Sequence, residues 1–575
     1  MSASHVAALP RDPSVGQAIE YAQSVFAAEL HIPDVRAECR EFPGEAIIVV
    51  HVPEVGEGAT RLANAVDGEL REAGFPGFVV VRQETREQSP LLRGAASVED
   101  ARVSQLVGLL AAHERTSETM PSMAYVSGGL HNLDVATTPR HHVVFGRRGV
   151  GKTALLLEAK ARVESLGHHT LWLNMNTYRD MPYPDLVLKV IERVAENCLM
   201  WVARTRGKSL AVERLARLLS AVRQPAPASR RADALRGLIA DANEALRVVG
   251  AELQARLYVF LDDLYYVPLD TQPLFLDALH RCVRDRDVWL KIATIRHQTR
   301  CYAFNDLRGL RLGHDAAEIN LDVTLENPAR ARGFLADILA AAAARCGIDR
   351  IEQVAYDWAV DRLTMSSGGV PRDFLSLFVG AVEESRIRGG KRKKVGVEDV
   401  NRAAGKAAAL KEQELAEDAA AGGTDTTPLM ELLAHVNGVC LRVPVERRIN
   451  FLRVDRHAAD TAKDSYDLLQ RLMDMRFVHL LDRGISDRHH PGTRHEVYLL
   501  DFSQYSADRL QRKLRVLDFR AGNLIFRRVG STDKPRIAKT AAQRLAILRA
   551  GPVLDLHAWR ASCSQPSTDT CPDTP

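Results

Sequence analysis

The feature that most constrains this chain is a glycine-rich segment between a short apolar run and the start of a helix. The segment reads Gly146-Arg147-Arg148-Gly149-Val150-Gly151-Lys152-Thr153. Residues 143–145 before it predict a buried strand, and residues 154–157 after it open a helix. A strand, a glycine loop ending in Lys-Thr and a helix N-terminus are the parts of a phosphate-binding loop.

Each residue type in this segment has a physical task. Glycines adopt the backbone angles that bring N–H groups around an anion, and the helix start adds its positive dipole end. Lys152 is placed to reach the β- and γ-phosphates of a nucleotide, and the Thr153 hydroxyl to ligate Mg²⁺. The predicted phosphate-binding residues of the loop are Gly146, Gly149, Val150, Gly151, Lys152, Thr153 and Ala154.

A second motif follows in residues 257–263, where an apolar strand ends in two carboxylates, Asp262 and Asp263. Asp262 is expected to hold the magnesium together with Thr153, directly or through water. Asp263 stands where a carboxylate would polarise the attacking water. An aspartate is one methylene shorter than a glutamate in that position, so slow hydrolysis is an alternative.

A further strand is predicted at residues 288–296. Thr294 and Arg296 at its exit are candidates for sensing the γ-phosphate, although Arg296 as a simple strand cap is the alternative. Arg308 and Arg311 come next and are candidates for an arginine finger, which would act on a neighbouring subunit of a homo-oligomer.

Helices predicted at residues 328–346 and 353–364 precede a Gly368-Gly369-Val370-Pro371 turn. Proline suits the first turn of a helix, where its missing N–H costs nothing. Arg372 in that turn could point back at the phosphates. We therefore predict an ATPase-type core over residues 97–325 and a helical lid over residues 326–412.

The N-terminal 96 residues predict a small α/β domain and a linker. A helix is expected first, followed by a strand, an amphipathic helix and a second strand. Their ranges are 14–40, 46–50, 59–73 and 77–81. No catalytic cluster stands out in this domain, so a protein-contact role and a structural role both remain open.

After a linker at residues 413–428, residues 429–505 predict a winged helix. The pattern is three helices followed by a strand pair with a long polar tip. The ranges are 429–436, 447–452 and 465–476 for the helices, and 477–481 and 496–500 for the strands.

The tip carries Arg483, Arg488 and Arg494, which could lie along the backbone of double-stranded DNA. The alternative is a winged helix that only packs on the ATPase core. Residues 506–562 form a basic extension with Phe519 and Phe526 interleaved, which also suits a polyanion, and residues 563–575 are expected to be disordered.

The composition narrows the class further. The chain has 575 residues, enough for several domains, and its formal net charge of +4 is too small to imply nucleic acid by itself. Eight scattered cysteines without a CxxC pair argue against a metal site and for a reducing compartment. No apolar run is long enough to span a membrane, and no signal peptide is recognisable. A cytoplasmic location is expected.

These motifs, in this order, resemble those of the P-loop ATPases of the AAA+/STAND group over residues 125–412. Within that group, Arg372 is similar to the sensor 2 arginine of origin-recognition-type AAA+ ATPases. Arg296 and Asp263 are similar to elements of NB-ARC-type STAND switches. Both branches remain open.

The resemblance implies an α/β fold with a P-loop core, a parallel sheet and a helical lid. It also implies an enzyme that binds ATP and Mg²⁺ and hydrolyses ATP. The favoured function is a nucleotide-driven switch coupled to DNA through the winged helix. The alternative is a signalling or scaffold ATPase that recruits a protein partner, for example through the N-terminal domain, without touching nucleic acid.

The glycine loop leads directly to one prediction. Lys152→Ala should abolish ATP binding or hydrolysis, because the substitution removes the cation that faces the β- and γ-phosphates. A steady-state ATPase assay, together with equilibrium binding of a fluorescent ATP analogue, measures this. Unchanged activity in the variant would overturn the nucleotide-site assignment.

Overall fold

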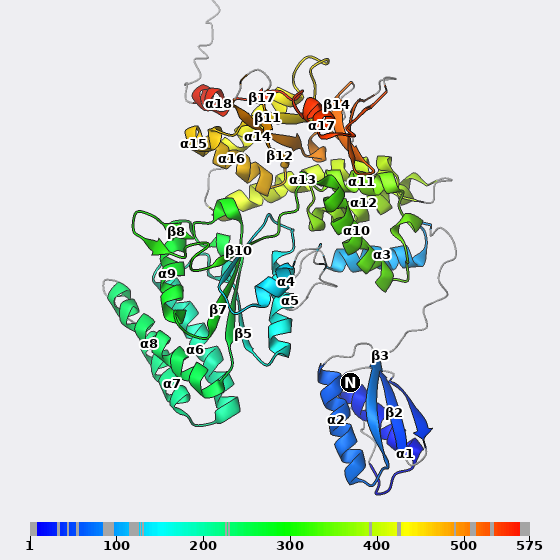
Figure 1. Ribbon diagram of the computed structural model, residues 1–575, viewed down its shortest axis with the longest axis vertical. Coiled ribbons are helices and arrows are strands. Elements are labelled where there is room, and N and C mark those ends of the chain that lie inside the picture. Colours follow the sequence, from blue (N-terminus) through cyan, green and yellow to red (C-terminus); the bar gives the residue numbers. More distant parts are fainter. Residues whose placement is uncertain are drawn as a thin grey trace, which may run out of the picture. The chain divides into compact units, whose positions relative to one another are not determined.

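The computed structural model divides into two compact units, Met1–Leu91 and Leu92–Pro575 (Figure 1). Each unit is described by itself. The described residues are 9–30, 35–42, 45–52, 57–83, 97–113, 126, 128, 131–224, 227, 231–389, 394–422, 427–487, 490, 492–506, 513–529 and 534–563. Arg488, the linker after Gln83 and the tail after Cys563 lie outside these residues.

The first unit is a three-stranded sheet with two helices. In chain order its elements are α1 (Val15–Glu29), β1 (Arg36–Phe42), β2 (Glu45–Val52), α2 (Glu57–Glu72) and β3 (Gly77–Gln83). The strand order is β1-β2-β3, with β1 antiparallel and β3 parallel to β2. Ile48 and Val50 on one face of β2 are fully buried with Phe26 of α1 and Leu70 of α2.

The helix predicted over residues 14–40 is shorter than expected. It begins after Ser14, whose side chain forms a capping box with Gln17, and it ends at Glu29. Residues 36–42 form the edge strand β1 instead. This strand alternates charged and small side chains, so the apolar signal that identifies buried strands is missing from it.

The second unit is built around a five-stranded parallel sheet in the order β10-β4-β7-β6-β5. The predicted α/β fold with a P-loop core and a parallel sheet is thereby confirmed. The strands are β4 (His142–Phe145), β5 (His169–Asn174), β6 (Leu257–Asp262), β7 (Val288–Thr294) and β10 (Ala317–Asn320).

Both faces of this sheet are covered by helices, as expected for parallel strands. Tyr258 and Phe260 of β6 pack on the side of α4 (Asn132–Thr137) and α5 (Lys152–Ser165). The other face packs against four helices, three of which fill the long connection between β5 and β6. These are α6 (Asp185–Arg206), α7 (Leu210–Val222), α8 (Arg231–Leu253) and α9 (Gln272–Val283).

A helical lid follows the sheet. It consists of α10 (Pro328–Arg345), α11 (Asp357–Ser366), α12 (Pro371–Arg388) and α13 (Val397–Gly422). Helix α3 (Ala101–Ala112), which was predicted to belong to the sheet core, joins the hydrophobic core of the lid instead. Arg386 of α12 ties down its start by donating to the Val98 carbonyl oxygen at 2.8 Å.

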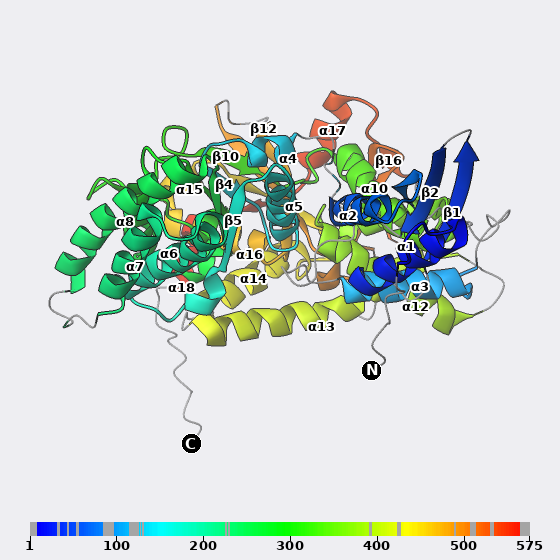
Figure 2. The ribbon, with the colours of Figure 1, turned by 90° about the horizontal axis from the view of Figure 1, so that it is seen from below.

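Helix α13 is long, and it extends from the lid toward the C-terminal region (Figure 2). It continues through Gly422, although residues 413–428 were predicted to be a linker. The alanine-rich sequence that suggests flexibility is also compatible with a helix, because alanine has the highest helix propensity.

The C-terminal region contains two further sheets. One has the order β12-β13-β11-β17 and the other β14-β15-β16. The elements are α14 (Thr427–Cys440), β11 (Phe451–Asp455), α15 (Ala458–Thr461), α16 (Lys463–Asp474), β12 (Val478–Ser486), β13 (Arg494–Leu500), β14 (Arg515–Arg520), β15 (Asn523–Arg528), β16 (Arg536–Ile537), α17 (Ala541–Leu548), β17 (Val553–Leu554) and α18 (Leu556–Cys563).

Two sequence predictions fail in this region. Residues 447–452 are not a helix, because β11 begins at Phe451 and pairs with both β13 and β17. Residues 506–562 are not a separate extension after the winged helix, since Leu517 and Phe519 of β14 are buried in the same core as the lid helices. The remaining domain boundaries stay predictions. Within the described residues, every helix is too short or too polar to cross a membrane.

The packing of β14 on the lid generates a stability prediction. Arg362 of α11 donates to Asp518 of β14 at 2.6 Å, and both side chains are nearly buried. Arg362→Ala should lower the free energy of unfolding by about 3 kcal/mol, because it removes the main partner of a nearly buried carboxylate. Arg330→Ala, at an exposed arginine of α10, is the matched control and should cost under about 0.5 kcal/mol. Urea denaturation followed by circular dichroism measures both, and equal effects would contradict a structural role for this pair.

Candidate nucleotide-binding site

The glycine loop connects β4 to α5 in a conformation that only glycine adopts easily. Gly149 and Gly151 have φ angles of 81° and 98°, in the left-handed region. Lys152, the first residue of α5, is buried, and its Nζ donates to the carbonyl oxygens of Gly146 at 2.8 Å and Arg147 at 3.1 Å. Burial lowers the pKa of this lysine. Its ammonium group is thus held inside the loop that the sequence predicted.

Asp262, at the end of β6, faces the start of α5. The Thr153 hydroxyl donates to Asp262 Oδ2 at 2.8 Å, and the Asp263 N–H donates to Asp262 Oδ1 at 3.1 Å. Burial raises the pKa of Asp262, and the neighbouring Asp263 raises it further. A hydroxyl beside two carboxylates at the end of a buried strand is a set of oxygen ligands that fits Mg²⁺.

Asp263 itself has a φ of 58°, so the chain turns sharply as it leaves β6. Burial raises the pKa of this carboxyl too, while Lys152 opposes the shift. The two aspartates and Lys152 therefore lie within electrostatic reach of one another. The predicted trio of Lys152, Thr153 and Asp262 is brought together at the carboxyl edge of the sheet.

The lid touches the loop through Arg372. Its backbone N–H donates to the Gly149 carbonyl oxygen at 3.2 Å. A Cβ on Gly149 would come within 2.8 Å of the Arg372 Cβ, so the lid and the loop are in close contact here. The first turn of α12 is therefore seated directly on the glycine loop, where a sensor arginine was predicted.

Arg147, inside the loop, was not predicted to have a role. Its side chain is 2% exposed, and its Nε donates to Asp322 Oδ1 at 3.2 Å. One terminal nitrogen, Nη2, donates to the carbonyl oxygens of Val323 at 3.1 Å and Gly368 at 3.2 Å. Arg147 thus joins the loop to the segment after β10 and to the turn that enters α12.

The predicted γ-phosphate sensors differ in their surroundings. Thr294 is fully buried, and its Oγ1 is 2.5 Å from the Oγ1 of Thr299. Arg296 pairs with Glu318 of β10, and its guanidinium lies 4.2 Å from the centre of the Phe145 ring. In this structure Arg296 is engaged at the β10 edge of the sheet.

Arg308 and Arg311, the candidate finger residues, lie on and after the hairpin of β8 (Tyr302–Ala303) and β9 (Arg308–Gly309). Arg311 donates to the Tyr302 hydroxyl at 2.5 Å, and its backbone N–H donates to Asp315. Arg308 is exposed. Their role as a finger toward a second subunit stays a prediction.

The candidate DNA-binding arginines lie on the β12–β13 hairpin. Arg483 of β12 donates to Glu326 Oε2 at 3.0 Å, before the first lid helix. Arg494, at the start of β13, is exposed. Arg488 lies outside the described residues. One of the predicted DNA contacts, Arg483, therefore forms a largely exposed ion pair with Glu326 in this structure.

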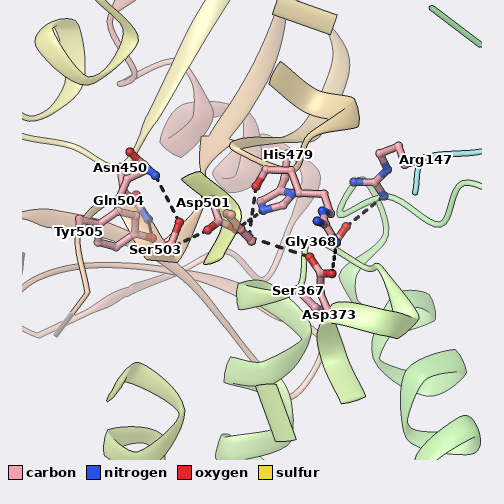
Figure 3. A network of polar contacts seen from close by, with 12 residues as sticks. Arg147, Ser367, Gly368, Asp373, Asn450, His479, Asp501, Ser503, Gln504 and Tyr505 are labelled. Atoms are coloured by element: carbon pink, nitrogen blue, oxygen red, sulfur yellow. Dashed lines mark hydrogen bonds and ion pairs between the residues drawn. The ribbon is translucent and has the colours of Figure 1, made fainter. Parts of the chain in front are cut away.

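A buried charge network connects the lid to the C-terminal region (Figure 3). Arg476, just after α16, pairs with Asp373 in the first turn of α12. Lys411 of α13 contacts Asp501 at 2.8 Å, and His479 of β12 contacts the same carboxylate at 2.7 Å. Burial alone would raise the pKa of Asp501, but Lys411 and His479 outweigh it and hold this pKa well below its usual value.

The network reaches the glycine loop through Gly368. A Cβ on this residue would lie 2.0 Å from His479 Nδ1, and its φ is 59°, so no other residue fits. Its carbonyl oxygen accepts from Arg147, as described above. The Gly-Gly turn that was predicted as a helix entry is therefore also the place where β12 approaches the lid (Figure 3).

Asp474, the last residue of α16, is a second unpredicted component. It is 3% exposed, and its Oδ2 has no hydrogen-bond partner among the described residues. Burial raises its pKa to about 7, with Asp322 adding to the shift and Arg147, Lys152 and Arg148 opposing it. The C-terminal region thus brings a carboxyl group into the electrostatic field of the glycine loop.

Sequence reasoning could not find these residues, because their partners are distant along the chain. Arg147 is separated by 175 residues from Asp322 and by 221 from Gly368. The glycine-loop pattern leaves its second position free, so nothing in the motif singles out an arginine there. Only the tertiary structure shows that the side chain at this variable position of the loop makes buried contacts with distant residues.

The loop, the Thr153–Asp262 pair and the parallel sheet together define a P-loop nucleotide-binding fold. No protein-family model matches the chain, and no curated protein matches it. Among solved structures it is similar to the Aeropyrum pernix Orc1 protein in complex with DNA, at 18% identity and a TM-score of 0.30, covering 74% of this chain and 94% of that one. It is also similar to Cdc6p from Pyrobaculum aerophilum, at 15% identity and a TM-score of 0.30, covering 67% and 94%.

A third similar structure is RuvB from Thermotoga maritima, solved as a single-residue variant. Its identity to this chain is 13%, and its TM-score is 0.27. The alignment covers 60% of this chain and 85% of the RuvB chain.

The burial of Asp474 generates a pH prediction. A carboxyl group has a pKa near 3.9 when unfolded. The folded state binds its proton more tightly, so this group's contribution to stability falls as pH rises from about 4 through 7. Asp474→Asn should therefore match the wild type near pH 4. At pH 8 it should be more stable, by on the order of a few kcal/mol at most.

Thermal unfolding at a series of pH values measures this difference. The matched control is Asp337→Asn, at an exposed position of α10. A stability difference for Asp474→Asn that stays constant between pH 4 and 8 would contradict the prediction.

Proposed function

We propose that this chain is an ATP-hydrolysing molecular switch of the AAA+ class. The observation that carries the proposal is the Thr153–Asp262 hydrogen bond of 2.8 Å beside the buried Lys152, at the end of a parallel sheet. A hydroxyl, a carboxylate and an ammonium group in this arrangement suit a nucleotide phosphate chain with its magnesium ion. The glycine φ angles support the same interpretation.

The roles of the residues follow from their positions. Lys152 and the N–H groups of the loop would bind the phosphates, and Thr153 with Asp262 would hold the metal. When bound, Mg²⁺ neutralises charge on the phosphate oxygens. Asp263 would orient the attacking water, and Thr294 and Arg372 would respond to the terminal phosphate.

Two contacts favour the AAA+ branch over the NB-ARC branch. Arg372 is seated on Gly149, as a lid sensor must be. Arg296, the residue that resembles the STAND element, is paired with Glu318 instead. The half-buried Asp263 is equally compatible with slow hydrolysis.

The switch would act through the contacts between loop and lid. Gly149–Arg372 and Arg147–Gly368 both connect the phosphate loop to the turn that begins α12. Asp373 of that turn pairs with Arg476 in the C-terminal region. A change of phosphate occupancy that moves the turn would therefore be transmitted to the C-terminal region.

The partner that we propose is double-stranded DNA. The chain order α14, β11, α15, α16, β12, β13 is helix, strand, two helices and a hairpin, which is the order of a winged helix. The exposed Arg494 on the hairpin is available for a phosphate. A homo-oligomer that uses Arg308 or Arg311 as a finger, and a protein partner for the N-terminal unit, remain open within this proposal.

The test is the steady-state ATPase rate with and without duplex DNA at low and moderate salt, with Lys152→Ala as the background control. We expect Mg²⁺-dependent hydrolysis that duplex DNA stimulates, and stimulation that weakens as salt rises, because phosphate contacts release counterions. Hydrolysis without any DNA binding would favour the scaffold alternative. Absence of ATP binding would overturn the proposal.

A further inference from the structure

The strongest unexplained surface lies on the small sheet β14-β15-β16, beside the loop that leads into β11. Five arginines lie on this sheet and on that loop, and we refer to them as the arginine surface. They are Arg447, Arg448, Arg515, Arg528 and Arg536. Arg447 and Arg536 are exposed, and the other three are half-buried.

The sheet register holds these cations together. Arg515 of β14 is directly opposite Arg528 of β15, and Arg536 of β16 is opposite Phe526, two residues from Arg528. Residues opposite each other or two apart on a strand share one face of a sheet. Arg515 also donates to the Arg447 carbonyl oxygen at 3.1 Å, which fixes the loop beside the sheet.

This concentration of positive charge is unfavourable in the protein alone. Like charges directly opposite on paired strands are destabilising. Burial, and then the neighbouring Arg528, lower the pKa of Arg515. Among the described residues, no carboxylate forms an ion pair with any of the five arginines.

The other charges of the sheet show a contrast. Asp518 of β14 pairs with Arg362 at 2.6 Å and lies 3.6 Å from Arg527. The carboxylate of Asp518 therefore neutralises arginines on the side of the sheet that packs against the lid, and not the five arginines of the arginine surface. Leu517 and Phe519, on the same face as Arg515 and Arg528, are buried. The half-buried Arg515 and Arg528 at the end of the strand pair, and the exposed Arg536, are therefore the part of this face that an external anion would meet.

The aromatic residues of the sheet indicate which polyanion fits. Single-stranded nucleic acids bind on exposed aromatic rings that stack with bases. Phe519 is 3% exposed, and Phe526 packs partly buried against the same hydrophobic core, so neither ring offers a stacking surface. Arginines held at fixed spacing suit phosphate groups, which they can bind with two parallel hydrogen bonds.

We propose that the arginine surface binds the phosphate backbone of duplex DNA. The inference deepens the DNA coupling proposed above and rests on it. It assigns the main electrostatic contact to β14, β15 and β16, and not to the tip of the β12–β13 hairpin. Sequence would be read elsewhere, since phosphate contacts fix position and orientation only.

The experiment measures binding of the full-length chain to a fluorescent duplex as a function of salt. The variants are Arg447→Ala, Arg528→Ala and Arg536→Ala, singly and combined, with Arg528→Lys as the charge-conserving change. Arg494→Ala tests the hairpin tip, and Arg214→Ala at an exposed arginine of α7 is the matched control. Circular dichroism and the thermal midpoint verify folding of each variant.

Log affinity falls as log salt rises. We expect each lost arginine contact to make this negative slope shallower by about 0.9. Arg528→Lys should keep the salt dependence but lose part of the affinity, because lysine keeps the charge and not the two parallel hydrogen bonds. Arg214→Ala should match the wild type, and Arg494→Ala should weaken binding less than Arg528→Ala does. A single-stranded oligonucleotide of equal length should bind more weakly than the duplex.

Several outcomes would overturn the inference. If the wild type binds DNA and the triple variant keeps the same slope, the arginine surface is not the contact, while the proposed function stands. If polyglutamate competes as well as the duplex at equal charge, the surface takes an acidic protein. If the wild type binds no duplex at all, both this inference and the DNA coupling fail. Binding that the triple variant loses would support the inference even in a protein that does not hydrolyse ATP.

Discussion

The buried guanidinium of Arg147 is the interaction on which the rest of the large unit depends. It satisfies Asp322 and the carbonyl oxygens of Val323 and Gly368 with one side chain. Truncation would remove the ion pair of Asp322 and leave the carbonyl oxygens of Val323 and Gly368 without this donor, although the Arg147 backbone N–H would still donate to Asp322. Each buried unsatisfied group costs about 1–3 kcal/mol. A phosphate loop is normally shaped by its own glycines and its ligand. In this protein the loop is also held by hydrogen bonds from one of its own residues, Arg147, to the segment after β10 and to the turn before α12.

Buried charges are also paired with one another in the network beside the Gly368-Gly369 turn. Asp373 and Asp501 are balanced by Arg476 and Lys411, and His479 completes the hydrogen bonding of Asp501. Buried ion pairs add little net stability compared with apolar packing, but removing one partner is costly. The network therefore serves to fix one docking geometry of β12 on the lid, since a sliding or rotated arrangement would leave charges buried and unpaired.

The sequence predicted what is encoded locally. The glycine loop, the apolar strand before Asp262 and the Gly-Gly turn are short patterns whose chemistry is readable without a fold. The sequence-based prediction failed where strand pairing overrides the local pattern. Residues 447–452 begin with a polar run that suggests a helix, but β11 starts at Phe451 as the inner strand between β13 and β17. Asp474 and His479 could not be predicted as neighbours of the loop, because burial and distant packing alone give them that position.

Hydrophobic continuity decides which parts of the large unit would move together. The lid helices, α3 and the C-terminal sheets share one contiguous core, whereas both faces of the nucleotide sheet belong to separate clusters. Well-packed cores move as rigid bodies and do not deform continuously. The joint of the proposed switch is therefore expected between the sheet and this combined body, where Gly149 meets Arg372 and Arg147 meets Gly368. A nucleotide bound at that joint would act on the lid and the C-terminal region as one.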